Sequence, residues 1–275
     1  MTTALGYTLS QYAGGVAPAW VAWSDQPPHS NMSSSLAHAK GVLSFDHLSG
    51  FLLRHSTPRF PLNASEGSYT GYPAYARIYG QTFLCVSYST AVLNELASQL
   101  IINGVNVYDA SITKELAQQA PLLAQLALGF KGPQIASSTR TFTSLAGNRF
   151  TDYAKSKYCK CELYTQIVAP QLNSDMAVLS WGRPLMGSGC KPFTQYNVMD
   201  INGMILQTPN GQIAYNETKE HSKLAMAAQG NVVCTGDINR MTSQAARGGG
   251  TTCFVNASLW NALTKQIGGW MSCST

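Results

Sequence analysis

Charged side chains are scarce in this sequence. Asp, Glu, Lys and Arg make up 11% of the 275 residues, which is less than half of the usual share. Hydrophobic residues reach 45%, so a sizeable core is possible and global disorder is excluded. The net charge of +5 comes from scattered residues and therefore assigns no partner by itself. A polar, nearly neutral surface of this kind is typical of secreted proteins.

Long hydrophobic runs are also missing. No stretch approaches the roughly 20 apolar residues of a membrane span, so we expect none. The N-terminus has no basic region followed by an apolar segment, so no signal peptide is visible. Seven cysteines and four Asn-x-Ser/Thr motifs nevertheless favour a secretory route. These motifs begin at Asn31, Asn63, Asn216 and Asn256.

Strand and helix patterns alternate along the chain. Strands are predicted over 19–23, 39–45, 50–55, 82–88, 139–145, 176–181, 198–206, 222–227 and 231–238. Helices are predicted over 91–102, 148–157, 162–168 and 257–267, with another from an N-cap at Ser111 through Leu128 that breaks at Pro121. A linker is expected near 132–138. The chain is therefore predicted to be α/β, with halves 1–135 and 136–275 in one globular unit.

The most informative residues are two of the five histidines. His38 and His221 each begin the pattern His-x-Lys, with Lys40 and Lys223 two positions on. Two such matches arise by chance at about the 1% level, a false-positive risk that any short motif carries. Each copy opens a predicted strand, where residues i and i+2 point to the same face. Each half thus supplies one imidazole with an ammonium group beside it.

This pairing suits the transfer of a phosphoryl group. One neutral imidazole can attack phosphorus, and a protonated one can give its proton to the leaving oxygen. The two ammonium groups can balance the charge that develops on the phosphate oxygens. Two surface histidines near lysines would be the plain alternative. We favour the functional interpretation because the pattern occurs once in each half.

Four longer segments carry a family resemblance. Residues 37–61 (AHAKGVLSFDHLSGFLLRHSTPRFP), 79–89 (YGQTFLCVSYS), 220–226 (EHSKLAM) and 234–253 (CTGDINRMTSQAARGGGTTC) resemble deoxyribonuclease II. The resemblance extends from about Thr3 to the C-terminus. It implies a phospholipase D-like fold of two pseudo-symmetric halves, each with a mixed β-sheet flanked by helices. It also implies an active site between the halves, with DNA as the substrate.

By the same resemblance, the activity is acid endonucleolytic cleavage of DNA without a metal or other cofactor. The products would carry 3′-phosphate and 5′-hydroxyl ends. The implied catalytic residues are His38, Lys40, His55, His221 and Lys223. We favour His38 as the nucleophile and His221 as the acid, although the two roles could be reversed. The family also implies a lysosomal or secreted location, and a homodimer stays open.

Further candidates follow the second His-x-Lys. Asn239 could hydrogen-bond a phosphate oxygen, and Asp237 could orient His221 or simply belong to a turn. Arg240, Arg247 and the glycines at 248–250 could form a flexible basic loop against the DNA backbone, or a surface turn. Three other cations, Arg54, Arg59 and Lys191, are expected to be solvated surface charges.

The resemblance also implies a pattern of disulfides. It pairs Cys234 with Cys253 and Cys190 with Cys273, and it leaves Cys85 free because the matching partner is missing. Cys159 and Cys161 match no position of the family. Extra surface thiols or an added bridge are favoured there over a zinc site, since no second Cys/His cluster exists.

The sequence departs from the family at several points. Glu220 and Leu224 flank the second His-x-Lys where the family has Asp and Trp. The family also carries several tens of residues before the position that matches Met1. Either the natural chain is longer or this is a degenerate member. The alternative function is therefore a catalytically impaired secreted protein that binds DNA or a host protein. Cleavage of a lipid phosphodiester is disfavoured by the segments around His55 and Gly248.

Overall fold

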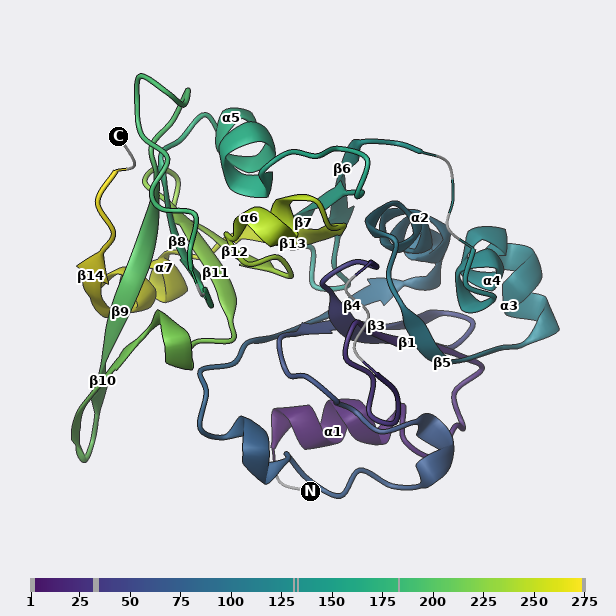
Figure 1. Cartoon of the computed structure of the whole chain (residues 1–275). Coiled ribbons are helices and arrows are strands. Elements are labelled where there is room, and N and C mark those ends of the chain that lie inside the picture. The colour runs from purple at the N-terminus through teal and green to yellow at the C-terminus, as the bar shows by residue number, and fades with distance from the viewer. Residues whose placement is uncertain (1–2, 32–34, 131, 133, 183, 274–275) are drawn as a thin grey trace.

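Two β-sheets lie side by side in the computed structural model, which describes residues 3–31, 35–130, 132, 134–182 and 184–273 (Figure 1). The first sheet has the strand order β4-β3-β2-β1-β5. Its strands are β1 (Ala19–Ser24), β2 (Lys40–Phe45), β3 (Ser49–His55), β4 (Phe83–Ser89) and β5 (Val107–Ile112). All of its pairings are antiparallel, so the mixed sheet expected in each half is not found in the first.

The second sheet is larger and mixed. Its main path runs β10-β9-β8-β11-β12-β13-β7-β6, with β14 paired to β9, and only β8 and β9 are parallel among the described pairings. The strands are β6 (Ser137–Thr143), β7 (Arg149–Lys155), β8 (Met176–Ser180), β9 (Val198–Thr208), β10 (Gly211–Asn216), β11 (Lys223–Ala227), β12 (Val232–Gly236), β13 (Gly249–Val255) and β14 (Ile267–Trp270). The β9–β10 hairpin extends away from the body (Figure 1).

Helices cover both faces of the first sheet (Figure 1). One face packs against α2 (Leu93–Asn103) and α4 (Pro121–Ala127), and the other against α1 (Ala4–Ser10). The remaining helices are α3 (Lys114–Gln119), α5 (Ala169–Leu172) after a π-helical turn (Tyr164–Val168), α6 (Thr242–Ala245) and α7 (Ala257–Thr264). Short 3₁₀ turns occupy Ala64–Glu66, Ala74–Ala76, Thr90–Val92 and Glu217–Lys219.

Strand β2, which begins at Lys40 of the first His-x-Lys, is buried on both faces because its apolar residues pack in two different cores. Leu43 of β2 packs on the α2 side, and its neighbour Val42 packs on the α1 side. Glycine is required at position 41, just before them, since a Cβ there would lie 2.3 Å from the Trp23 ring and 2.6 Å from the Leu53 carbonyl oxygen. The start of β2 is thereby held close to β1 and β3.

The α/β fold with two sheets is confirmed, as is the helix that breaks at Pro121, but one helix prediction is wrong and the start of another is misplaced. Residues 148–157 contain β7, which pairs with β6 and β13. Ser111 lies in β5, and the cap of the following helix is Thr113, whose hydroxyl accepts from the Leu116 N–H. The boundary near residue 135 stays a prediction: β6 begins the second sheet, yet its Phe142 packs in the core of the first.

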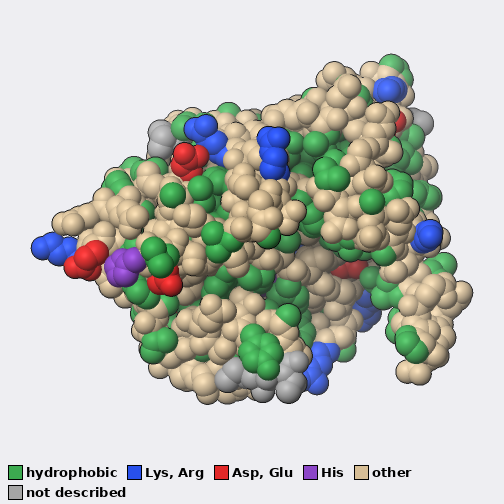
Figure 2. All heavy atoms as spheres, turned by 180° about the vertical axis from the view of Figure 1, so that it is seen from behind, with side chains coloured by type: hydrophobic (Ala, Val, Ile, Leu, Met, Phe, Trp, Pro, Cys, Tyr) green, Lys and Arg blue, Asp and Glu red, His purple; other side chains and the backbone are tan. Residues whose placement is uncertain are grey.

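The predicted bridges Cys190–Cys273 and Cys234–Cys253 are both present. Cys159 and Cys161 form an added bridge, and Cys85 is free and exposed on β4. Within the described residues, no helix is long and apolar enough to cross a membrane. Charged side chains are few and spread over the face in Figure 2, as the composition predicts. Of the Asn31 motif, residues 32 and 33 lie outside the described residues.

Candidate active site

Both His-x-Lys patterns line a single cavity of about 390 Å³ between the two sheets. Lys40 is the first residue of β2 and Lys223 is the first residue of β11. His38 lies in a bend and His221 in an irregular segment just before these strands, and all four side chains line the cavity. The structure thus brings together the four residues that the sequence pairs only by pattern.

Asp25, which sequence reasoning missed, lies at the centre of the positive charges. Its Oδ1 is 2.6 Å from Lys40 Nζ, and its Oδ2 is 3.1 Å from Arg247 Nη2 and 3.9 Å from His38 Nε2. Burial alone would raise the pKa of Asp25, but Lys40 and His38 lower it to about 2. This carboxylate is therefore ionised and fixes both cations.

His38 has its two ring nitrogens in different surroundings. Nδ1 lies 2.5 Å from the main-chain carbonyl oxygen of Asp237, which can only accept a hydrogen bond. Nδ1 therefore carries the hydrogen, and Nε2 of the neutral ring keeps its lone pair. Burial, followed by the charge of Lys40, holds the pKa of His38 well below its ordinary value of 6.5. Both effects favour the neutral form of the ring.

The imidazole of His221 lies next to two aromatic side chains. Its imidazole lies against Tyr79, with the ring centroids 4.3 Å apart, and Trp181 is 6.1 Å away. No residue in the described part of the chain hydrogen-bonds its ring nitrogens. Burial, then Lys223 and Lys40, lower the pKa of His221 to about 4. A negatively charged ligand between the lysines would raise that pKa again.

His55 does not line the cavity. It is buried behind the two lysines, where its ring stacks on Phe83 at 6.0 Å and meets Phe60 edge-on at 5.7 Å. Burial, together with Lys40, lowers the pKa of His55 to about 3. His55 is therefore the one implied catalytic residue that lies outside this cavity, and its role stays a prediction.

Asp237 does not orient His221, contrary to one of the two roles considered for it. Its Oδ2 accepts from Arg54 Nη1 at 3.0 Å, while Arg54 Nη2 lies 2.8 Å from Asp152 Oδ1. Arg54 is 5% exposed, so its expected place on the solvated surface is also wrong. This buried triad joins β3 of the first sheet to β7 and the end of β12 in the second. Arg59 and Lys191 are exposed as expected.

The arginines after Asp237 differ from each other. Arg240 is buried away from the cavity, with Nη1 2.7 Å from Asp200 Oδ1, so it is not the phosphate contact that we expected. Arg247 lines the cavity, where its Nε donates to the Leu36 carbonyl oxygen at 2.9 Å. Asn239 lines it as well.

The flexible basic loop, one of the two alternatives for Arg240, Arg247 and the glycines at 248–250, is not found either. Residues 242–245 form α6, and the glycines at 249 and 250 begin the buried strand β13. Lys155, another residue that sequence reasoning missed, is fully buried, and its Nζ donates to the carbonyl oxygens of Ala245 and Arg247 at 2.7 Å each. The chain that carries Arg247 is thereby fixed.

The cavity as a whole is cationic. Lys40, Lys223 and Arg247 outnumber the one carboxylate, Asp25, which suits a phosphodiester anion. Within the described ranges, no group of three or more His, Cys, Asp or Glu residues is placed to hold a metal ion.

Comparison with known proteins agrees with this geometry. Residues 1–273 match the family model described as deoxyribonuclease II. The chain is 38% identical to deoxyribonuclease-2 of Caenorhabditis elegans, over 84% of this chain and 60% of the relative. It is 34% identical to deoxyribonuclease-2-alpha of Sus scrofa, over 99% and 76% respectively. A protein of Burkholderia thailandensis named putative deoxyribonuclease-2 is 32% identical, over 95% of this chain and 75% of the relative. The chain therefore belongs to the deoxyribonuclease II family.

Proposed function

We propose that this protein is an acid endodeoxyribonuclease that needs no metal ion and leaves 3′-phosphate and 5′-hydroxyl ends. One observation carries the proposal: both His-x-Lys pairs line one cavity, and the two imidazoles in it differ in their hydrogen bonding. DNA as the substrate is supported by the names of the relatives. Because the chain spans about 60% of the C. elegans relative, the activity of the whole protein is part of this proposal.

The first chemical step breaks the bond between phosphorus and the 5′-oxygen. His38 Nε2 supplies the electron pair that forms a P–N bond, and protonated His221 gives its proton to the leaving 5′-oxygen. One strand end leaves as a 5′-hydroxyl. The other stays on His38 as a phosphohistidine. The Nδ1 hydrogen stays on His38 throughout, where it is hydrogen-bonded to the Asp237 carbonyl oxygen. The imidazole therefore need not rotate.

The second step regenerates the enzyme. His221, now neutral, takes a proton from water, and the resulting hydroxide attacks phosphorus. The P–N bond breaks, His38 becomes neutral again, and the product leaves with a 3′-phosphate. Lys40 and Lys223 compensate the oxygen charges in both transition states. Asp25 holds Lys40 and Arg247 in position for this task.

Acid pH is favoured because of His221. Its pKa of about 4 means that the proton needed for the first step is present only in acid before the substrate binds. Burial lowers the pKa of Lys223 to about 7, with Lys40 adding to this shift, so this ammonium group is also fully charged only below neutrality. A secreted or lysosomal location fits this requirement and the three disulfides.

Plasmid nicking at pH 5 in excess EDTA tests the proposal. The wild type should convert supercoiled DNA to open circles, and the His38→Asn variant should not. Added Mg²⁺ should leave the rate unchanged because lysines supply the positive charge. Loss of nicking in EDTA with recovery in Mg²⁺ would refute the two-histidine mechanism. DNA binding without any nicking by the wild type would favour the impaired, DNA-binding alternative.

A further inference from the structure

The ring of Tyr79 lies against the imidazole of His221, and the mechanism proposed above gives this tyrosine no task. The two ring centroids are 4.3 Å apart and the ring planes differ by 32°, so the rings meet with their faces rather than with their edges. Tyr79 belongs to the long loop between β3 and β4, and both side chains are half-buried. An imidazole from the second half of the chain is thus packed on a ring from the first.

The main chain beside Tyr79 is bonded to the main chain beside His221. The Gly80 N–H donates to the carbonyl oxygen of Lys219 at 2.8 Å, and the His221 N–H donates to the carbonyl oxygen of Gly80 at 2.8 Å. Glycine is needed here, since a Cβ at position 80 would lie 2.5 Å from both carboxylate oxygens of the buried Glu220. The contact between the two rings therefore follows from a fixed register of the two segments.

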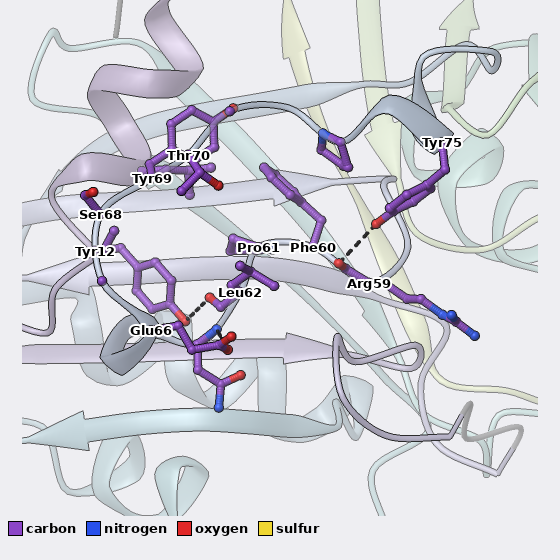
Figure 3. A pocket seen from close by; sticks show the side chains of 16 residues that line it. Tyr12, Arg59, Phe60, Pro61, Leu62, Glu66, Ser68, Tyr69, Thr70 and Tyr75 are labelled. Carbon is purple, nitrogen blue, oxygen red and sulfur yellow. Dashed lines mark hydrogen bonds between the residues drawn. The ribbon is translucent and has the colours of Figure 1, made fainter.

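The loop that carries Tyr79 is also anchored within the first half (Figure 3). Four positions before Tyr79, the Tyr75 hydroxyl donates to the carbonyl oxygen of Pro58 at 2.7 Å and lies 3.1 Å from that of Arg59. These bonds tie the end of the loop to its beginning. Tyr79 therefore needs no ligand to reach His221.

The charges around His221 favour its neutral form. After burial, Lys223 and Lys40 are the neighbours that lower its pKa. The carboxylate nearest in sequence, that of Glu220, accepts from the Tyr215 hydroxyl at 2.8 Å and forms no described ion pair with the imidazole. The other charged or titratable residues that line this cavity or contact the Tyr79 ring are Asp25, His38, Arg247 and Lys219. The face of an aromatic ring is partly negative, so contact with Tyr79 favours the protonated form.

We propose that Tyr79 is a positioning residue for the acid, which sets the plane of the His221 imidazole and stabilises the protonated form of that ring. The inference rests on the proposed function, because it takes His221 to be the acid of the first step. No described residue hydrogen-bonds the ring nitrogens of His221. Contact with an aromatic face fixes the ring without competing with the leaving oxygen for its proton, whereas a hydrogen-bond acceptor would hold the proton that the acid must release.

Graded replacement of the ring tests the proposal without needing turnover. The full-length protein is made with phenylalanine, 4-fluorophenylalanine or 3,4,5-trifluorophenylalanine at position 79, because fluorine withdraws charge from the ring face and changes its size little. The pKa of His221 is measured by NMR in the free protein, where His221→Asn assigns the signal. It should be the same in Tyr79→Phe as in the wild type. It should then fall with each fluorinated ring, by about half a pH unit or more in the trifluoro variant.

The same three rings at position 158, an exposed tyrosine elsewhere in the chain, are the matched control and should leave the pKa of His221 unchanged. A pKa that stays constant through the series at position 79 would overturn the proposal. Because the titration is read in the free protein, this result does not depend on nicking.

Nicking kinetics separate this inference from the proposed function. At pH 5 the trifluoro variant should lose about threefold or more in kcat/KM relative to Tyr79→Phe, because less of His221 is protonated. Tyr79→Leu should lower kcat as well, because the imidazole is no longer held in its plane. A pKa that shifts while nicking does not would support the role of Tyr79 and count against His221 as the acid. A Tyr79→Leu protein with the wild-type kcat and the wild-type pH profile would overturn the proposal.

Discussion

The imidazole of His38 donates its Nδ1 hydrogen in a hydrogen bond to the main-chain carbonyl oxygen of Asp237. His38 directly precedes a strand of the first sheet and Asp237 directly follows a strand of the second, so contact between the sheets fixes the tautomer of His38. A side-chain acceptor could be lost by mutation or protonation, whereas a carbonyl oxygen of the main chain has neither weakness. The bond leaves Nε2 as the only basic nitrogen of the ring. This asymmetry between His38 and His221 is what the assignment of chemical roles depends on.

A trapping experiment distinguishes the two roles. His221→Asn should lower turnover about 10²- to 10⁴-fold, since it removes the acid but leaves the nucleophile. Acid-quenched mass spectra of this variant with an oligonucleotide should show a phosphoryl adduct on His38. The converse variant, His38→Asn, should show no adduct. An adduct on His221 in that variant would reverse the roles, and full activity of either variant would refute the mechanism.

Removing the Asp25 carboxylate should damage both stability and activity. Asp25→Asn leaves the buried Lys40 without its anion and also removes the ion pair with the half-buried Arg247, so the free energy of unfolding should fall by about 3–5 kcal/mol. Turnover should fall at least tenfold in protein that is still folded. Urea unfolding and single-turnover nicking measure the two effects. The control is Glu115→Gln on exposed α3, which should change stability by less than about 0.5 kcal/mol. An unchanged Asp25→Asn protein would show that the carboxylate is not needed.

The pH dependence should follow the protonation of His221. Because the pKa of His221 is lowered to about 4, kcat/KM should fall about tenfold per pH unit as the pH rises above that value. The descending limb of kcat should lie at higher pH, since the bound phosphate raises this pKa. The Lys223→Gln variant should turn over more slowly. The descending limb of its kcat/KM profile should move to higher pH, because removing this positive neighbour raises the pKa of His221. Profiles of kcat/KM from pH 3.5 to 7 check both signs, and a limb that moves downward would contradict the assignment.

The stability of the fold should fall in acid partly because of His55. The pKa of His55 is lowered to about 3, so between pH 6.5 and 3 the unfolded chain binds a proton that the native ring does not. Stability from this residue is present above pH 6.5 and is lost as the pH falls. Between pH 7.5 and 5 the loss is about 2 kcal/mol. His55→Phe keeps a ring against Phe83 and should lose about 2 kcal/mol less over this interval in urea unfolding. Equal losses in both proteins would mean that His55 is protonated in the native state.

The four His and Lys residues of the site could be predicted because their pattern is local. Each histidine is two residues from its lysine, just before a strand, so pairing His38 with Lys40 and His221 with Lys223 needed no tertiary information. Asp25 differs, because its role depends on the register that places Ser24 opposite Lys40. A signal existed, since Asp25 is the first acidic residue after a buried strand. The sequence does not reveal which strand lies next to it.

Burial of charge could not be predicted for the same reason. Arg54 has partners 98 and 183 residues away, and without them an arginine belongs on the surface. The error at 148–157 also has a tertiary cause. Apolar residues at 150, 153 and 154 fit a helical period, but pairing with β6 and β13 overrides it. Local sequence patterns correctly predicted the helices and strands that pack mainly against segments close to them in the sequence.

The carbonyl oxygen that fixes His38 comes from a residue 199 positions later in the chain. A ribosome that has completed only the first sheet has made His38 and Lys40, but the acceptor for Nδ1 and the acid His221 do not yet exist. The proposed nucleophile, His38, has its tautomer fixed only when residue 237 is present and the sheets have met. A polypeptide that ends before residue 221 therefore lacks both the acid and the acceptor that the proposed reaction needs.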